Sequence, residues 1–271
     1  EIAQCLVGSE MCIRDRDMRW SYNERRYKKL LQYHPGGLLL YLYGNSGQVE
    51  HLFDLFRKVF EAIAEQGVNA EERGYLSGIV RRVDEQYYTD EWAKCCLLLY
   101  KKELLQKPPL CLQRLFFRHP DKMKMFLEEN PSRSFDVEND YYLPEEAYQD
   151  KRAFDCWAEC LYEEFPEILG YIMGKSCNGK DGAFPHEFIR EFLEKQQNEK
   201  LTKAVFYGKF NSRGARIVQD GRTLYEQAKC YRAQARELRL KFPQSAKILL
   251  QLAKWMESEA QHDQLEAEIV P

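Results

Sequence analysis

The sequence GRTLYEQAKCYRAQARELRLKFPQSAKILLQLAKWMESEAQHDQLEAE, residues 221–268, has the clearest periodicity in the chain. Apolar side chains recur every three or four residues from Leu224 to Phe242, and again from Ala246 to Ala260. This spacing places each set along one face of an amphipathic helix. The first helix has to end at Phe242, because a residue that precedes proline is disfavoured in the α region. The stretch therefore predicts an antiparallel helical hairpin with arms of about 20 residues, or about 30 Å, each.

Helical periodicity of the same kind continues upstream of the hairpin. Residues 49–63 carry a strong apolar stripe, Gly67 follows as a helix terminator, and Asn69 with Glu72 has the pattern of a capping box. Further amphipathic segments lie at residues 75–87, 90–106, 110–119 and 144–165. We therefore predict an all-α fold, an irregular stack of antiparallel helical pairs that ends in the long C-terminal hairpin.

A short pattern, Leu-x-x-x-His/Phe-Pro, occurs four times, with its prolines at Pro35, Pro120, Pro166 and Pro243. In each copy we expect the leucine to anchor the last turn of one helix and the proline to begin the next helix. The prolines are irregularly spaced, and the chain matches neither the tetratricopeptide nor the ankyrin pattern. The motif thus predicts a helix–proline–helix junction at each copy, without a regular solenoid.

The apolar run at residues 38–43, LLLYLY, is compatible with either a strand or a buried helical turn. Residues 44–47, Gly-Asn-Ser-Gly, follow it, and a strand, a Gly-rich turn and a helix would form a phosphate-binding layout. However, Gln48 and Val49 stand where a P-loop has Gly-Lys-Ser/Thr. We therefore interpret residues 44–47 as a plain turn that opens a helix.

Two stretches define the expected domain boundaries. Residues 5–16, CLVGSEMCIRDR, resemble the in-frame translation of a transposon adapter used to prepare sequencing libraries, so we expect residues 1–16 to be an artefact without a fold. Residues 128–143 lack periodicity and are rich in turn formers, which is typical of a linker. The remaining chain then divides into an N-terminal helical subdomain at residues 17–127 and a C-terminal one at residues 144–271, which contains the hairpin.

Composition indicates a cytoplasmic protein. The chain is 44% hydrophobic and 31% charged, and its apolar runs are far shorter than the about 20 residues of a membrane span. From residue 17 onwards there are seven cysteines, an odd number in a mid-sized chain. Such usage is typical of reduced thiols in the cytoplasm. We expect no association with membranes.

Charge is distributed unevenly along the chain. Residues 128–191 contain 16 Asp and Glu against 6 Lys and Arg, whereas residues 200–255 contain 13 Lys and Arg against 3 acidic residues. The two segments can dock on each other, or the basic one can bind a polyanion or a partner. The side chains that would make such contacts are Arg213, Arg216, Arg222, Arg232, Arg236, Arg239, Lys241 and Lys247.

The candidate metal motifs are incomplete. The core Asp181-Gly182-x-Phe184 resembles the end of an EF-hand loop, but aligning Gly182 with the invariant glycine puts Cys177, Gly179 and Phe188 where ligands should stand. Cys156 and Cys160 lie four residues apart on a helix without a partner pair. Glu259 and His262 have the spacing of a di-metal helix, but the second copy that such sites need is missing.

No catalytic, cofactor-binding or metal-ligating residue is therefore predicted, and no cofactor. The helical pairs with aromatic stripes favour a non-catalytic interaction or scaffold protein that binds a protein partner. One alternative is a nucleic-acid-binding protein that uses the basic segment 200–255. A second alternative is the helical accessory part of an enzyme that is truncated at its N-terminus.

Overall fold

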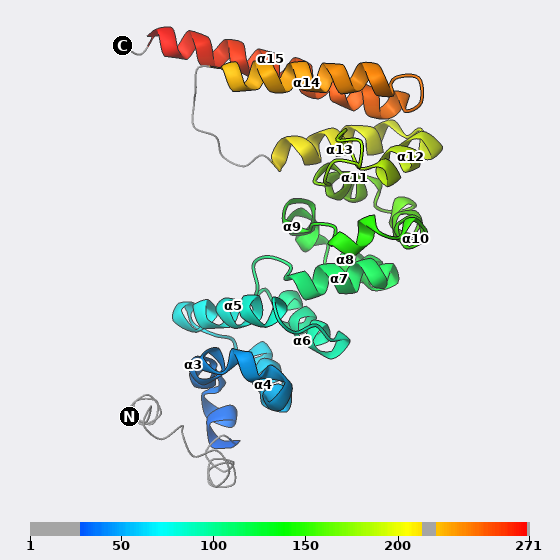
Figure 1. The fold of residues 1–271 in the computed structure, drawn as a ribbon. Coiled ribbons are helices and arrows are strands. Elements are labelled where there is room, and N and C mark those ends of the chain that lie inside the picture. Colours follow the sequence, from blue (N-terminus) through cyan, green and yellow to red (C-terminus); the bar gives the residue numbers. More distant parts are fainter. Residues whose placement is uncertain (1–27, 213–220, 270–271) are drawn as a thin grey trace. The chain divides into compact units, whose positions relative to one another are not determined.

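The computed structural model describes residues 28–212 and 221–269, apart from the side chains of residues 135 and 266–269. Throughout these ranges the regular structure is helical, and no strand occurs in them (Figure 1). This confirms the all-α prediction. No helix in the described ranges combines the length and the apolar character needed to cross a membrane. Residues 1–16, as well as Arg213 and Arg216, lie outside the described part of the chain.

The chain forms two compact units, residues 1–112 and 113–271. The helices of the first unit are η2 (Pro35–Leu38), α3 (Leu39–Gly44), η3 (Ser46–Gln48), α4 (Val49–Gln66), α5 (Ala70–Asp84) and α6 (Asp90–Lys101). Helix α7 (Leu110–Arg118) begins in the last residues of the first unit. The second unit continues with α8 (Pro120–Glu129), η4 (Pro131–Arg133), α9 (Ser134–Asp140), η5 (Glu145–Tyr148), α10 (Lys151–Tyr162), α11 (Pro166–Gly174), α12 (Glu187–Gln196), α13 (Glu199–Asn211), α14 (Arg222–Leu238) and α15 (Pro243–Ile269).

Aromatic packing between α4 and α6 forms the core of the first unit. The ring of Trp92 lies 6.0 Å from that of Phe56 and 5.5 Å from that of Phe60, and all three side chains are fully buried. The boundaries of these helices follow the predicted signals. Gly67 ends α4 with φ of 82°, and Asn69 and Glu72 form a reciprocal capping box at the start of α5.

Helix α3 and the end of α6 decide two local predictions in the first unit. The open question at residues 38–43 is answered by helix α3, whose Leu39 and Leu42 are fully buried. The helix predicted at residues 90–106 ends earlier, at Lys101, because Glu103 adopts a positive φ of 59° that an α-helix cannot accommodate.

Residues 128–143, the expected linker, belong to the second unit and contain short helical elements. These are η4 and α9, and Val137 and Tyr141 are fully buried. The Tyr141 hydroxyl donates a hydrogen bond to the Gln113 carbonyl oxygen at 2.9 Å. Two apolar side chains four residues apart are enough to anchor this short helix, although they are too few to reveal its period. The helix expected to open at Pro144 likewise begins later, because Asp150 caps the N-terminus of α10.

The four Leu-x-x-x-His/Phe-Pro copies share one geometry. In each, the residue before proline donates its backbone N–H to the leucine carbonyl four residues earlier, at 2.7 to 2.9 Å. The four leucines are buried, and each proline begins the next helical element: η2, α8, α11 and α15. This geometry fits proline chemistry, because the first residue of a helix has no use for a backbone N–H.

Helices α14 and α15 form the predicted antiparallel hairpin (Figure 1). Its core consists of buried Leu224, Ala228, Ala253, Met256 and Ala260. Gly221 marks the backbone register, since a Cβ there would lie 2.6 Å from the Ala260 carbonyl oxygen. The turn is therefore centred between Leu240 and Lys241 rather than at Pro243.

The ion pair across the hairpin depends on the direction of its side chains as well as on the position of the turn. A turn centred on Pro243 would put Lys229 beside Glu257, but Glu257 binds Arg232, with 2.7 Å between Arg232 Nε and Glu257 Oε1. Helical side chains point toward the N-terminus of their own helix. In an antiparallel hairpin, Arg232 therefore leans away from the turn and Glu257 leans toward it, so the two meet although their backbones are offset. Lys229 pairs instead with Glu226 of its own helix.

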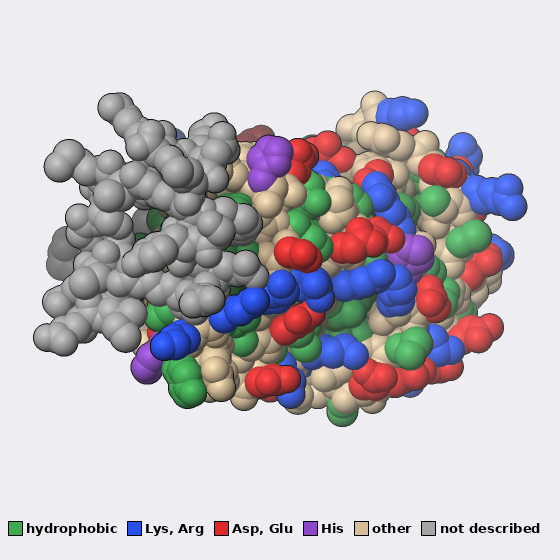
Figure 2. Space-filling model, turned by 90° about the horizontal axis from the view of Figure 1, so that it is seen from below, with side chains coloured by type: hydrophobic (Ala, Val, Ile, Leu, Met, Phe, Trp, Pro, Cys, Tyr) green, Lys and Arg blue, Asp and Glu red, His purple; other side chains and the backbone are tan. Residues whose placement is uncertain are grey.

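The face of the molecule drawn in Figure 2 is polar and mixed in charge. On this face, Lys and Arg side chains lie among Asp and Glu side chains, and hydrophobic side chains emerge only in small, scattered areas (Figure 2). Exposed pairs such as Arg57 with Asp54 and Glu61, at 3.2 and 3.3 Å, are typical of such a surface. Pairs of this kind contribute little to stability, about 0 to 1 kcal/mol each.

Candidate functional site

The first unit contains a groove of about 860 Å³ that follows α5. Residues of α5 and its C-cap line the groove from Glu71 to Glu85, and residues 105–110, including Pro108 and Pro109, line it as well. Tyr43 of α3 also lines it. With a rise of about 1.5 Å per residue, α5 gives the groove a length of about 20 Å.

Glycines and tyrosines shape this groove. Gly74 has open space around it, because a Cβ at this position would meet no atom within 4 Å. At Gly78, by contrast, a Cβ would lie 2.7 Å from the Tyr43 ring, so the missing side chain makes room for the tyrosine. The Tyr43 ring meets the Tyr75 ring edge-on at 5.7 Å, and the Arg82 guanidinium lies 3.9 Å from the Tyr43 ring centroid. The groove therefore combines aromatic rings with charged side chains such as Glu71 and Arg81.

A buried polar cluster lies at the C-terminal end of α5. It consists of Asp84, Cys96 and Cys111, whose ligand-type atoms all lie within 4.8 Å of one another. All three residues are buried, and Asp84 also lines the groove. Asp84 Oδ1 accepts a hydrogen bond from Trp92 Nε1 at 2.9 Å, and Oδ2 accepts one from the Cys111 backbone N–H at 3.2 Å. These bonds fix the carboxylate beside the two thiols.

Burial governs the chemistry of the two thiols. It raises the pKa of Cys96, and it raises that of Cys111 well above the ordinary value, because a thiolate would lose its hydration. Both are therefore protonated at neutral pH, and they react poorly as nucleophiles.

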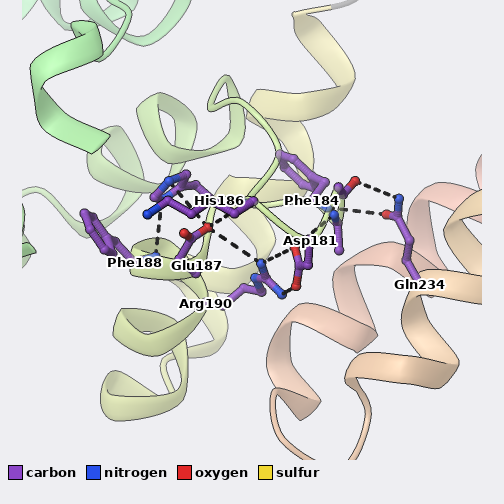
Figure 3. A network of polar contacts seen from close by, with 10 residues as sticks. Asp181, Phe184, His186, Glu187, Phe188, Arg190 and Gln234 are labelled. Carbon is purple, nitrogen blue, oxygen red and sulfur yellow. Dashed lines mark hydrogen bonds and ion pairs between the residues drawn. The ribbon is translucent and has the colours of Figure 1, made fainter. Parts of the chain in front are cut away.

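The loop with EF-hand resemblance in the second unit is held by an arginine (Figure 3). Arg190 of α12 is almost fully buried and forms a two-pronged bond with Asp181, at 2.7 and 2.8 Å. Asp181 also accepts the Ala183 backbone N–H at 3.1 Å. Both carboxylate oxygens thus bind protein donors. The Arg190 hydrogen bonds lower the pKa of Asp181.

The same loop is attached to the hairpin through Gln234 of α14 (Figure 3). Gln234 accepts the Phe184 backbone N–H at 3.4 Å and donates to the Gly182 carbonyl oxygen at 3.2 Å. His186 is buried, and its Nε2 lies 3.4 Å from Glu187 Oε2. Burial lowers the pKa of His186. His186 Nδ1 accepts the Phe188 N–H and so caps α12. These contacts assign a structural role to the loop.

The candidate basic residues that the structure describes lie at separate places along α14 and α15. Arg232 is bound to Glu257, and Arg222 lies at the opposite end of α14 from the turn. Arg236, Arg239, Lys241 and Lys247 are exposed near the hairpin turn. Within the described residues, no ion pair joins Arg236, Arg239 or Lys247 to an acidic side chain. The N-terminus of α15 does meet an acidic residue, because Glu194 accepts the Gln244 backbone N–H at 2.7 Å.

A second, smaller hollow of about 380 Å³ lies between α13 and α15. Its lining combines aromatic and basic side chains: Lys203, Phe206, Tyr207, Gln251, Lys254 and Trp255. Tyr207 is 42% exposed and stacks on Tyr171, with ring centroids 6.4 Å apart and an interplanar angle of 18°. The periodicity of α13 gave no indication of this aromatic surface.

The sequence also carries one signal of the buried cluster. Asp84 stands four residues after Val80 and eight after Leu76, so it occupies a position on the buried stripe of α5.

Comparison with protein-family models finds no matching family, and comparisons with curated proteins and with solved structures find no match either.

Proposed function

We propose that the protein is a non-catalytic helical interaction module whose α5 groove binds an extended segment of a protein partner. The groove carries this proposal: it is about 860 Å³ in volume and is lined by Tyr43, Tyr75, Pro108 and Pro109. Aromatic and proline side chains bury large apolar areas at low entropic cost, which favours peptide recognition. At about 3.4 Å per residue, a length of about 20 Å suits about six residues of extended chain.

The charges along the groove suggest how the register of the segment is fixed. Glu71 and Glu85 lie toward its two ends, while Arg81 and Lys107 supply positive charge. A partner segment with an apolar centre and charges of both signs fits this lining. Such rim charges contribute more to specificity and association rate than to affinity. The free cysteines support a reducing environment, and we place the protein in the cytoplasm.

The test uses a peptide library displayed on phage, selected against the full chain. Recovered peptides are synthesised, and their affinity is measured by fluorescence anisotropy for the wild type and two variants. Gly74→Leu fills the groove at a position with open space, so the fold tolerates it. Gly47→Leu is the matched control, since Gly47 is exposed, has equally open surroundings and lies outside the groove.

We expect Gly74→Leu to weaken peptide binding at least tenfold and Gly47→Leu to leave it unchanged. Peptides that bind both variants equally well would show that the groove is not the binding site. Failure to enrich any peptide would contradict the proposal as a whole.

The α13–α15 hollow favours a second candidate function, the binding of single-stranded nucleic acid by the basic segment 200–255. An exposed, stacked aromatic ring beside Lys203 and Lys254 combines a base-stacking surface with phosphate-binding charge. Fluorescently labelled polyuridine is the probe. On this candidate, Tyr207→Ala weakens binding by about one stacking interaction, about 1 to 3 kcal/mol. Wild-type protein that does not bind polyuridine at low salt would exclude it.

A further inference from the structure

We propose that Asp84, Cys96 and Cys111 form a binding site for one zinc ion. This inference does not depend on the proposed partner binding: it rests on the side chains of the cluster, and the groove enters only as the ion's route. The three residues come from the end of α5, the middle of α6 and the start of α7. Three helical elements thus meet at the site, and a bound ion would join them.

The separation of the donor atoms suits zinc. All three ligand atoms already lie within 4.8 Å of one another. Tetrahedral zinc with Zn–S bonds of about 2.3 Å and Zn–O bonds of about 2.0 to 2.2 Å needs its ligands about 3.5 to 3.8 Å apart. A contraction of at most about 1.0 to 1.3 Å therefore closes the site, and a change of side-chain torsion angle can supply it.

The donor set selects among metals. Two sulfurs and one carboxylate are too soft for calcium or magnesium, which take oxygen ligands almost entirely. Zinc accepts this mixture, and two thiolates neutralise its charge in a buried place. The third ligand, Asp84, is already oriented. Each of its oxygens accepts one protein hydrogen bond, from Trp92 or from the Cys111 backbone, and keeps a further lone pair for the ion.

The groove gives the ion a route to this buried place. Asp84 is 8% exposed and lines the groove, whereas Cys96 is fully buried and Cys111 is 1% exposed. An ion can therefore meet the carboxylate first and the thiols next. The cluster has three members among the described residues, so water or the second Asp84 oxygen would complete the coordination.

The test begins with the full chain, reduced and stripped of metal, and uses Co²⁺ as a spectroscopic probe. We expect one equivalent of Co²⁺ to produce a thiolate-to-cobalt charge-transfer band, and one equivalent of Zn²⁺ to remove it by displacement. Cys96→Ser and Cys111→Ser should each abolish the band and weaken metal binding at least 100-fold. Asp84→Asn should weaken it at least tenfold. The double variant Cys156→Ser/Cys160→Ser, which alters the other cysteine pair, is the control and should keep the band.

Two further measurements keep the test decisive if a core variant does not fold. X-ray absorption of the zinc-loaded wild type should find two sulfur scatterers per zinc, and zinc should raise its melting temperature. Three results would overturn the proposal: no band in the wild type, a band that survives both single cysteine variants, or a zinc shell without sulfur. A wild-type protein that loses two hydrogens in mass on purification and cannot bind metal would identify the pair as a disulfide instead.

Discussion

Gly174 of α11 and Gly208 of α13 meet backbone to backbone: a Cβ added to Gly174 would lie 2.7 Å from the Gly208 Cα atom and 2.3 Å from the Val205 carbonyl oxygen. One turn earlier, a Cβ on Gly170 would lie 2.5 Å from the Ala204 Cβ atom. Small residues spaced four apart on both helices therefore allow α11 and α13 to pack closely. Neither Gly174 nor Gly208 has a positive φ, so their backbone conformation does not require glycine. Glycine is needed at both positions because a side chain would not fit.

This contact predicts that Gly174→Ala and Gly208→Ala each destabilise the protein. Alanine is the better helix former by about 0.8 to 1 kcal/mol. Overpacking against rigid backbone costs about 1 to 3 kcal/mol, so the clash outweighs the gain. Chemical denaturation measures the free energy of unfolding. Gly74→Ala is the control, because a Cβ there meets no atom, and it should raise stability by about 0.5 to 1 kcal/mol. Equal effects at Gly174 and Gly74 would contradict this account.

Local signals made much of the fold predictable from the sequence. The capping box at Asn69 and Glu72, the helix end at Gly67 and the four proline junctions each depend on residues within four positions of one another. The hairpin was predictable because its apolar stripes run for many turns. Its register was not, because it depends on where the turn is centred and on the direction in which Arg232 and Glu257 lean.

The candidate sites were harder to predict for a physical reason. Asp84, Cys96 and Cys111 belong to three helical elements, and only the packing of those helices brings them within 4.8 Å. The groove is formed partly by a side chain that is missing, at Gly74, and a missing side chain leaves no positive signal in a hydrophobic pattern. The candidate basic residues, by contrast, follow directly from composition, but helix geometry spreads them along α14 and α15.

The Arg190–Asp181 pair predicts unequal costs for removing its two members. Asp181→Ala leaves a guanidinium that is 2% exposed without its main partner, which costs up to about 3 kcal/mol because Glu187, at 3.9 Å, compensates only in part. Arg190→Met leaves a carboxylate that is 53% exposed and can be hydrated, so it should cost about 1 kcal/mol or less. Denaturation of both variants measures the difference.

A double variant and a pH series check this asymmetry. Asp181→Ala/Arg190→Met should be no less stable than Arg190→Met alone, since no buried charge is left unpaired. Arg190 lowers the pKa of folded Asp181, so the pair's contribution to stability is present above the ordinary aspartate pKa and is lost as the pH falls through the folded value. A costlier Arg190→Met than Asp181→Ala would contradict the interpretation.

The buried amine of Lys175 leads us to predict a second pH dependence of stability, at neutral to alkaline pH. Burial lowers the pKa of Lys175 to about 7, while Asp140 and Glu138 oppose the shift, and its Nζ lies 2.6 Å from the Glu138 carbonyl oxygen. Below about pH 7 the folded protein must hold a buried charge, so the cost is fully present there. The unfolded state keeps the Lys175 proton up to a much higher pH than the folded state does. The free energy of unfolding therefore increases as the pH rises above 7, because the folded protein no longer holds the buried charge.

Lys175→Met tests this sign. The wild type should gain stability relative to the variant as the pH rises from 6 to 9, because the variant has no amine to deprotonate. The difference between the two proteins cancels the contributions of the buried thiols and tyrosines. Competitive acetylation followed by mass spectrometry provides a direct measurement, in which Lys175 should behave as a neutral amine just above pH 7. A difference that stays constant with pH would exclude the lowered pKa.

The hairpin turn gives the last prediction, on the charge reversal Arg236→Glu/Arg239→Glu. Both side chains are exposed, and neither forms an ion pair with a described acidic residue, so docking on the acidic segment 128–191 receives no support from their contacts. The free energy of unfolding should therefore change by less than about 1 kcal/mol.

If the basic segment 200–255 binds nucleic acid, the same variant should weaken polyuridine binding strongly. The slope of log affinity against log salt should fall by about 0.7 for each phosphate that the variant no longer neutralises. Lys58→Glu/Lys94→Glu is the matched control, because it makes the same change in net charge on α4 and α6, and it should preserve both properties. Loss of several kcal/mol in the turn variant alone would instead indicate that Arg236 and Arg239 do stabilise the fold through the acidic segment. If the variant is unchanged in both assays, the turn is an ordinary solvated surface.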